Sequence, residues 1–223
     1  MAQDFERLFL TGVGTTAQDL PDGSDFNSDD TIIGINMANT SANAITASCF
    51  MTSSVLSYGA DFTFVVTVVG GNFLIDGQTK PQLTLYKGFT YTFDVSHSSN
   101  SGHVLRFATQ AEGANSSIIT AGVTATGTPS QANAKVVITT SSTTASTLYY
   151  YCTQSGHSGM GNSITVTNVH YIIKDAPIPS GSALQLLDGG AKMVVQNNDR
   201  MFFQSNTASS LDVWLSRVDS IST

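Results

Sequence analysis

The chain has 223 residues, of which 41% are hydrophobic and only 11% are charged, so it can bury one large core or two small ones. Its formal net charge of −7 argues against a basic groove that follows phosphates, and we expect no nucleic-acid partner. The amino terminus has no apolar signal segment, and no apolar run is long enough to cross a bilayer, so we expect no signal-directed secretion and no membrane insertion.

Short runs of β-branched and aromatic residues alternate with Gly, Asn, Asp and Ser along the whole chain. This pattern, which has almost no helical period, predicts an all-β fold of sandwiches or barrels with under about 10% helix. The predicted strands cover residues 7–10, 31–37, 45–51, 62–69, 82–86, 90–95, 103–108, 135–139, 148–152, 163–166, 169–174, 184–187, 192–195, 200–204 and 211–218.

Five acidic residues fall between Asp19 and Asp30, in a stretch rich in Gly, Pro and Ser that is typical of a loop. Oxygen-rich loops can bind calcium, but the twelve-residue ligand spacing that closes with Glu is absent. Because runs of one charge sign are usually solvated, we predict a solvated acidic loop.

The predicted strands are split unequally along the chain, with three before residue 57 and five after residue 168. Neither end alone has enough strands to close a two-sheet core, whereas the two ends together do. We therefore predict that residues 1–57 and 168–223 form one outer, jelly-roll-like β-sandwich, into which residues 60–167 are inserted at a loop tip. Three consecutive modules, or one elongated sheet, are the alternatives.

The two cysteines have different neighbours. Cys49 lies in an apolar run and is expected to be a small buried hydrophobic residue. Cys152 ends a predicted strand and is followed by a tight polar loop that carries His157 and Met160. A disulfide could join only these two cysteines, and a reducing compartment argues against it.

A thiolate, an imidazole and a thioether thus fall within nine residues, in the spacing C-x4-H-x2-M. His103 opens another predicted strand, with its side chain on the apolar face, and is expected at the same end of the sandwich. Two imidazoles and a thiolate with a distant thioether suit copper, whereas zinc prefers a stronger fourth ligand. His103, Cys152, His157 and Met160 are therefore the candidate ligands of a copper site. The alternative is a binding module whose cysteine and histidines hold no metal and are empty or hydrogen-bonded.

Residues 149–160, together with Ser-Gly-His-Val-Leu-Arg-Phe at 101–107, resemble the cupredoxin family. The resemblance covers roughly residues 62–167 and implies a Greek-key β-sandwich that holds type 1 copper. It assigns the upstream histidine to His103 and the loop ligands to Cys152, His157 and Met160. The family usually has Asn after the first histidine to tie the ligand loops together; Val104 stands there, which predicts a looser site. The rim of the loop also lacks the apolar docking patch of an electron carrier.

The two ends of the chain show a second resemblance, carried by Asn-Met-Ala-Asn-Thr at 36–40, Lys-Asp-Ala-Pro-Ile-Pro at 174–179 and the strand at 211–217. They resemble the small β-sandwich virion structural proteins of tailed bacteriophages, some of which carry an inserted β domain. The resemblance implies a homo-oligomer or symmetric array, assembled in the host cytoplasm, that contacts capsid, neck or tail proteins. The insert would then project outward, where the host surface is a further partner.

Trp214 is a candidate contact residue of this outer sandwich. Leu211, Val213 and Leu215 share the inward face of its predicted strand, so the indole should point outward, and exposed Trp residues often anchor interfaces. The alternative is that this strand is covered on both faces.

These patterns give one leading hypothesis and two alternatives. The leading hypothesis is a phage structural protein that displays a cupredoxin-like module, as head decoration or as a neck or tail accessory protein. The first alternative is a copper-binding protein for electron transfer or metal sequestration, and the second is a carbohydrate-binding adhesin that uses Tyr149, Tyr150 or Tyr151. His97 and His170 are expected to be an exposed loop residue and a strand-edge residue. No catalytic grouping is recognisable, so we expect no enzyme.

Overall fold

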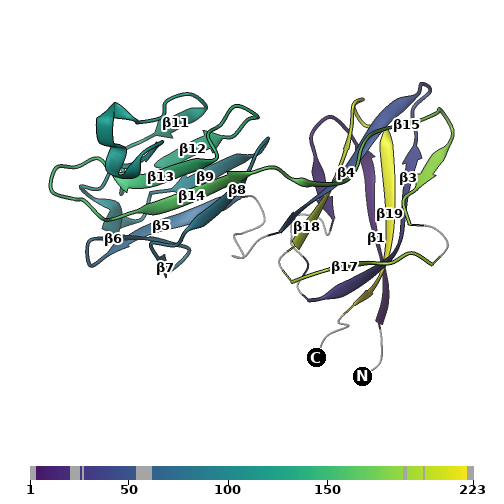
Figure 1. Cartoon of the computed structure of the whole chain (residues 1–223), viewed down its shortest axis with the longest axis horizontal. Coiled ribbons are helices and arrows are strands. Elements are labelled where there is room, and N and C mark those ends of the chain that lie inside the picture. Colours follow the sequence, from purple (N-terminus) through teal and green to yellow (C-terminus); the bar gives the residue numbers. More distant parts are fainter. Residues whose placement is uncertain are drawn as a thin grey trace. The chain divides into compact units, whose positions relative to one another are not determined.

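The computed structural model describes residues 4–20, 26, 28–53, 62–187, 190–197 and 199–219. Within these residues the protein is all-β, as predicted, and its helical segments are two short 3-10 turns, η1 (Ser98–Asn100) and η2 (Ala111–Ser116). No helix in the described ranges has the length and apolar character needed to cross a membrane. The contacts divide the chain into two compact units (Figure 1): unit 1 is Met1–Ser57 with Val169–Thr223, and unit 2 is Tyr58–Asn168.

Unit 1 is a sandwich of two sheets, to which both ends of the chain contribute. Its strands are β1 (Asp4–Val13), β2 (Gln18–Leu20), β3 (Asp30–Asn39), β4 (Ile45–Ser53), β15 (His170–Ile178), β16 (Ala183–Gln185), β17 (Met193–Val195), β18 (Asp199–Ser205) and β19 (Leu211–Asp219). One sheet has the order β1-β19-β3-β16, with β17 also paired to β3, and the other has the order β15-β4-β18-β2.

Every strand of the first segment in unit 1 pairs with a strand of the last segment. β19 lies between β1 and β3, β4 lies between β15 and β18, and β2 pairs with β18. Met51 of β4 is the direct partner of His170 at the start of β15. The two segments that flank unit 2 in the sequence are therefore hydrogen-bonded neighbours.

The core of unit 1 follows the alternation of its strands. On β19, Leu211, Val213 and Leu215 are buried, while Trp214 stays 49% exposed, as predicted from the sequence. Cys49 is fully buried among apolar side chains, and this burial raises the pKa of its thiol well above the usual range. Each sheet therefore presents one apolar face to the other.

The predicted solvated acidic loop is wrong at both of its ends. Asp19 lies on β2 and accepts a hydrogen bond from Nε of Arg200 at 3.0 Å. Asp30 begins β3, is fully buried, and accepts a hydrogen bond from Nη1 of Arg217 at 2.6 Å. A carboxylate can be buried when an opposite charge pairs with it, and each arginine lies more than 180 positions away in the sequence. Residues 21–25 lie outside the described ranges.

Unit 2 is also built from two sheets. Its strands are β5 (Thr63–Val69), β6 (Asn72–Ile75), β7 (Gln78–Thr79), β8 (Leu83–Tyr86), β9 (Thr90–Asp94), β10 (Leu105–Ala108), β11 (Val123–Thr126), β12 (Lys135–Thr139), β13 (Thr147–Cys152) and β14 (Asn162–Thr167). The sheet orders are β10-β13-β14-β8 and β11-β12-β9-β5-β6-β7. The β6–β7 hairpin was not predicted from the sequence.

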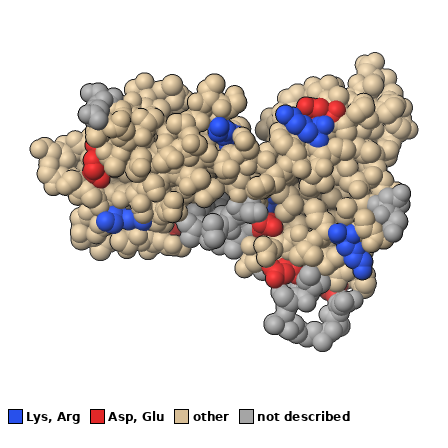
Figure 2. Space-filling model, in the orientation of Figure 1, with Lys and Arg blue, Asp and Glu red and all other residues tan. Residues whose placement is uncertain are grey.

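Aromatic side chains fill the space between the two sheets of unit 2. Phe93 of β9 and Phe107 of β10 are fully buried, and their ring centroids are 5.0 Å apart. Tyr91 and Phe64 extend this cluster along the β9–β5 side. Charged side chains are sparse on the face shown in Figure 2, in line with the composition. The core thus holds its shape mainly through apolar and aromatic packing.

Candidate metal centre

Two predicted ligands meet because β10 and β13 are antiparallel neighbours. Cys152 is the last residue of β13, and its partner across the ladder is Leu105, the first residue of β10. His103 lies two residues before Leu105, in the turn that precedes β10, and does not open the strand as predicted. The pairing nevertheless brings His103 and Cys152 to the same edge of the sheet.

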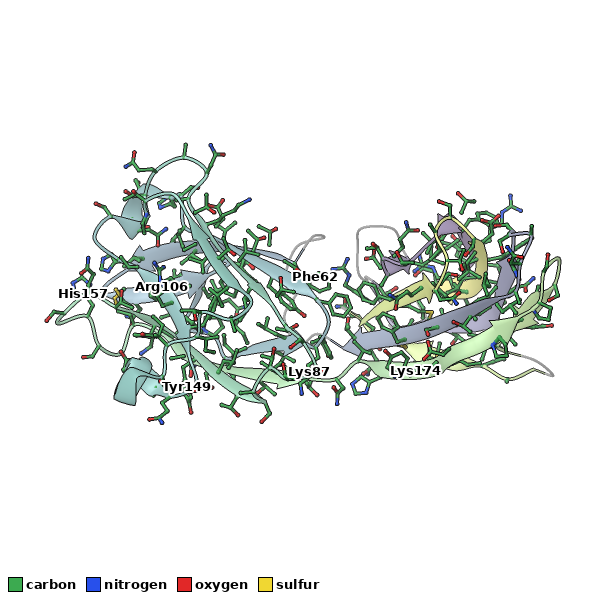
Figure 3. The ribbon with its side chains drawn as sticks, turned by 90° about the horizontal axis from the view of Figure 1, so that it is seen from above. Phe62, Lys87, Arg106, Tyr149, His157 and Lys174 are labelled. Carbon is green, nitrogen blue, oxygen red and sulfur yellow. The ribbon has the colours of Figure 1, made fainter. Side chains whose placement is uncertain are left out.

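His157 completes the group from the loop that follows β13. The ligand atoms of His103, Cys152 and His157 all lie within 4.8 Å of one another. The Sγ atom of Cys152 is 3.6 Å from Nδ1 of His157, and the two imidazole centroids are 4.7 Å apart. In Figure 3 His157 lies at one end of unit 2, and Phe62 and Lys87 lie toward its other end.

The contact between Cys152 and His157 has the distance of a thiol–imidazole hydrogen bond and is also compatible with two ligands of one metal ion. A thiolate and an imidazole held tetrahedrally at about 2.3 Å and about 2.05 Å from a metal would have their ligand atoms about 3.6 Å apart. The distance from Cys152 Sγ to His157 Nδ1 is 3.6 Å.

His103 has an unused ligand atom. Its Nδ1 is buried and has no hydrogen-bond partner among the described residues. Burial and the neighbouring His157 lower the pKa of His103, which keeps the ring neutral at pH 7. A buried polar atom without a partner costs free energy, and a neutral imidazole nitrogen is a good metal ligand. The donor atoms therefore fit a metal ion.

Met160 follows His157 by three residues in the same loop and is 2% exposed. Its carbonyl oxygen accepts a hydrogen bond from the N–H of Phe73 at 2.9 Å. The ring of Phe73 lies near that of His103, at a centroid distance of 6.5 Å. Phe73 therefore contacts the main chain of Met160 and the ring of His103, and the role of Met160 as a fourth ligand stays a prediction.

The two ligand loops are tied together by the main chain. The N–H of Thr153, directly after Cys152, donates to the carbonyl oxygen of Val104, directly after His103, at 3.0 Å. The sequence predicted a looser site because Val104 replaces an asparagine side chain. A main-chain hydrogen bond links the same two positions and does not depend on that side chain.

The end of the ligand loop has no room for a side chain at Gly161. A Cβ atom at Gly161 would lie 1.7 Å from the carbonyl oxygen of Tyr150, so only glycine fits there. Gly159 has a φ of +76°, a conformation that glycine adopts without strain. These two glycines let the chain turn from His157 into β14.

Sequence reasoning missed the residues that hold this loop from outside. Lys80 follows the β6–β7 hairpin and donates from Nζ to the carbonyl oxygen of Gly159 at 3.0 Å. Asn162 donates from Nδ2 to the carbonyl oxygen of Lys80 at 2.8 Å. No motif links these positions, because Lys80 and Gly159 are 79 positions apart. A hairpin predicted between residues 72 and 79 could have indicated that Lys80 follows a turn at the edge of the sheet.

The remaining histidines lie outside the group. His97 is an exposed residue whose Nδ1 accepts from the N–H of Ser99, as expected for a loop residue. His170 lies at the start of β15 in unit 1. Within the described ranges, His103, Cys152 and His157 form the one group of three or more His, Cys, Asp or Glu side chains that could hold a metal ion.

Comparisons with known proteins add no further information: no family model, no curated protein and no solved structure matches the chain. The chemistry of the centre must therefore be inferred from its own atoms. Two imidazoles and one thiol, converging at the end of a β-sandwich, could hold a soft or intermediate metal ion.

Proposed function

We propose that unit 2 is a cupredoxin-like module that binds copper through His103, Cys152 and His157, with Met160 as a weak fourth ligand. The observation that carries the proposal is the convergence of three ligand atoms within 4.8 Å, one of them a buried imidazole nitrogen without a partner. Two nitrogens and one thiolate favour copper when no strong fourth ligand is present.

The alternative metal is zinc. Structural zinc sites are almost always closed by four Cys, His or carboxylate ligands, and the group in unit 2 has three. A buried thioether such as that of Met160 is a poor ligand for zinc and an adequate axial ligand for copper. The donor set therefore favours copper.

The protein side of the chemistry follows from the geometry. Cys152 loses its thiol proton when it binds the ion, and His103 and His157 bind through neutral nitrogens. The strand pair β10–β13 and the Thr153–Val104 hydrogen bond keep these side chains together before the ion arrives. Copper in such a site supplies one-electron redox chemistry.

A copper titration tests the proposal. Addition of Cu(II) to the purified protein should produce an intense thiolate-to-copper band in the red at a stoichiometry of one. The band should disappear in Cys152→Ser and persist in the matched control Cys49→Ser, because Cys49 lies in the other unit. A stoichiometric, colourless zinc complex that copper does not displace would contradict the proposal.

We propose, as a second function, that the whole chain is a structural component of a tailed-phage particle in which unit 1 docks onto capsid, neck or tail proteins. The supporting observation is an aromatic pair on the outer face of unit 1. Phe9 and Trp214 are 51% and 49% exposed, and their ring centroids are 5.3 Å apart. Exposed aromatic groups of this kind are frequent anchors of protein interfaces.

Purified particles test the second function. The chain should be recovered in them at a copy number that matches a symmetry axis of the particle. Trp214→Ala should lower its incorporation, while a substitution of the half-exposed Tyr171 on β15 serves as a control in the other sheet of unit 1. Absence of the chain from washed particles would rule this function out.

A further inference from the structure

The loop that carries His157 and Met160 is held by a lysine from outside the predicted ligand set. The ammonium group of Lys80 donates a hydrogen bond to the carbonyl oxygen of Gly159 at 3.0 Å. Gly159 directly precedes Met160, so this bond fixes the peptide that leads into the predicted fourth ligand. Hydrogen bonds from a charged donor are stronger than neutral ones.

The base of the lysine side chain is itself fixed. The N–H of Lys80 donates to the carbonyl oxygen of Phe73 at 2.9 Å, and the carbonyl oxygen of Lys80 accepts from Asn162 at 2.8 Å. The carbonyl oxygen of the next residue, Pro81, accepts a hydrogen bond from the hydroxyl of Tyr150 at 2.8 Å. These hydrogen bonds fix the main chain on both sides of Lys80, and so they fix the position and orientation of its Cα–Cβ bond.

The same hairpin reaches the ligand loop at a second point. The N–H of Phe73 in β6 donates to the carbonyl oxygen of Met160. Lys80 and Phe73 therefore hold the consecutive carbonyl groups of Gly159 and Met160. Gly159 has positive φ and no side chain, and a Cβ built there would meet no atom within 4 Å, so on the Gly159 side only hydrogen bonding restrains this peptide.

We propose that Lys80 is a positioning residue for the metal centre. Its hydrogen bond holds the Gly159–Met160 peptide and so places the thioether of Met160 against the group formed by His103, Cys152 and His157. This inference rests on the proposed copper function for its metal-dependent consequences. The hold of Lys80 on the loop is independent of any metal.

Two variants and a matched control test the role of Lys80. Lys80→Met keeps the aliphatic chain and loses the donor, whereas Lys80→Arg restores a charged donor. Lys87→Met is the control, because Lys87 is also half-buried, donates from Nζ to a loop carbonyl at 3.3 Å, and lies away from His157 (Figure 3).

The first measurement is amide hydrogen exchange of the metal-free protein at residues 159–161. Loss of a charged hydrogen bond of about 1.4 kcal/mol corresponds to about tenfold faster exchange in Lys80→Met. Lys80→Arg should recover at least part of this protection, and Lys87→Met should match the wild type. Equal exchange in Lys80→Met and the wild type would overturn the proposal.

The second measurement uses the copper-loaded protein. Lys80→Met should shift the thiolate-to-copper band and speed the release of copper to a chelator by about 10- to 100-fold, as expected for the loss of a residue that orients ligands. If the band and the release rate of Lys80→Met equalled those of the wild type, the proposal that Lys80 positions the copper ligands would be overturned. If the wild type bound no copper, the proposed function would fail, and the exchange experiment would still decide whether Lys80 holds the loop.

Discussion

Each unit contains one buried cysteine, and the two differ in what surrounds the sulfur. Cys49 of unit 1 is fully buried among apolar side chains, and burial raises the pKa of its thiol. Cys152 of unit 2 is 4% exposed but has an imidazole nitrogen 3.6 Å from its Sγ. Burial alone therefore does not separate a structural cysteine from a candidate metal ligand. The polar atoms close to the sulfur distinguish the two kinds of cysteine.

Arg217 of unit 1 and His103 of unit 2 differ in how their buried polar atoms are satisfied. In unit 1, Arg217 is paired with both Asp30 and Glu6, and Arg200 is paired with Asp19. In unit 2, by contrast, Nδ1 of His103 is buried at the metal group without a partner among the described residues. Paired charges stabilise a scaffold, whereas an unused ligand atom costs stability until a ligand binds.

Thiol labelling gives the largest expected difference between the units. Cys49 should react only when unit 1 unfolds, so its labelling should be suppressed by about 10³-fold or more relative to a free thiol. Cys152 should react in the metal-free protein when its loop opens, and copper should protect it. Labelling of the single variants Cys49→Ser and Cys152→Ser by mass spectrometry checks this. Faster labelling of Cys49 than of metal-free Cys152 would break the comparison.

Gly161→Ala should damage unit 2 without affecting unit 1. The added Cβ would lie 1.7 Å from the carbonyl oxygen of Tyr150, so the main chain must move. We expect unit 2 to lose more than about 3 kcal/mol of unfolding free energy, and the metal group to lose its geometry. Gly156→Ala in the same loop is the comparison for the clash: its Cβ meets no atom within 4 Å, and its positive φ, which Gly161 does not have, should cost only about 1–2 kcal/mol. Denaturant unfolding followed by separate probes for each unit measures the effect.

Arg217→Met should destabilise unit 1 without affecting unit 2. It leaves the fully buried carboxylate of Asp30 without its arginine partner, which typically costs about 3–5 kcal/mol. The loss should appear in the unfolding of unit 1, while copper binding by unit 2 stays unchanged. The double variant Arg217→Met with Asp30→Asn should recover part of the stability, and failure to do so would argue against the buried pair as the cause.

Trp214→Ala has the smallest expected effect on folding. The side chain is half-exposed and contributes mainly its contact with Phe9, which is worth about 1 kcal/mol. A destabilisation well above this value in the isolated chain would indicate that Trp214 is a core residue rather than an interface residue. Thermal unfolding of the wild type and the variant distinguishes these outcomes.

The sequence was sufficient for the all-β class and for singling out His103, Cys152 and His157, which the structure brings together, whereas Met160 as a ligand stays a prediction. Alternation along 211–218 predicted which face of β19 is buried, and the close spacing of Cys152, His157 and Met160 singled out their loop. His103 was found because its residue type completes the set. The geometry of that group, with its unpartnered nitrogen, came only from the structure.

Interactions between distant segments could not be predicted in the same way. Asp30 looks like part of a solvated acidic run until Arg217, 187 positions later, is placed beside it. Lys80 looks like an ordinary turn residue until the sheet brings it to Gly159. The sequence pattern around a charged residue does not indicate which distant residue pairs with it. The partner can be identified only when the strand order is known.

The pairing of Met51 with His170 has a consequence for how the chain is put together. Two positions that face each other across an antiparallel ladder lie about 5 Å apart, close enough for a short turn to join them. A short turn could therefore join β4 directly to β15 as a β-hairpin. An inserted domain whose two ends lie close together could join them equally well.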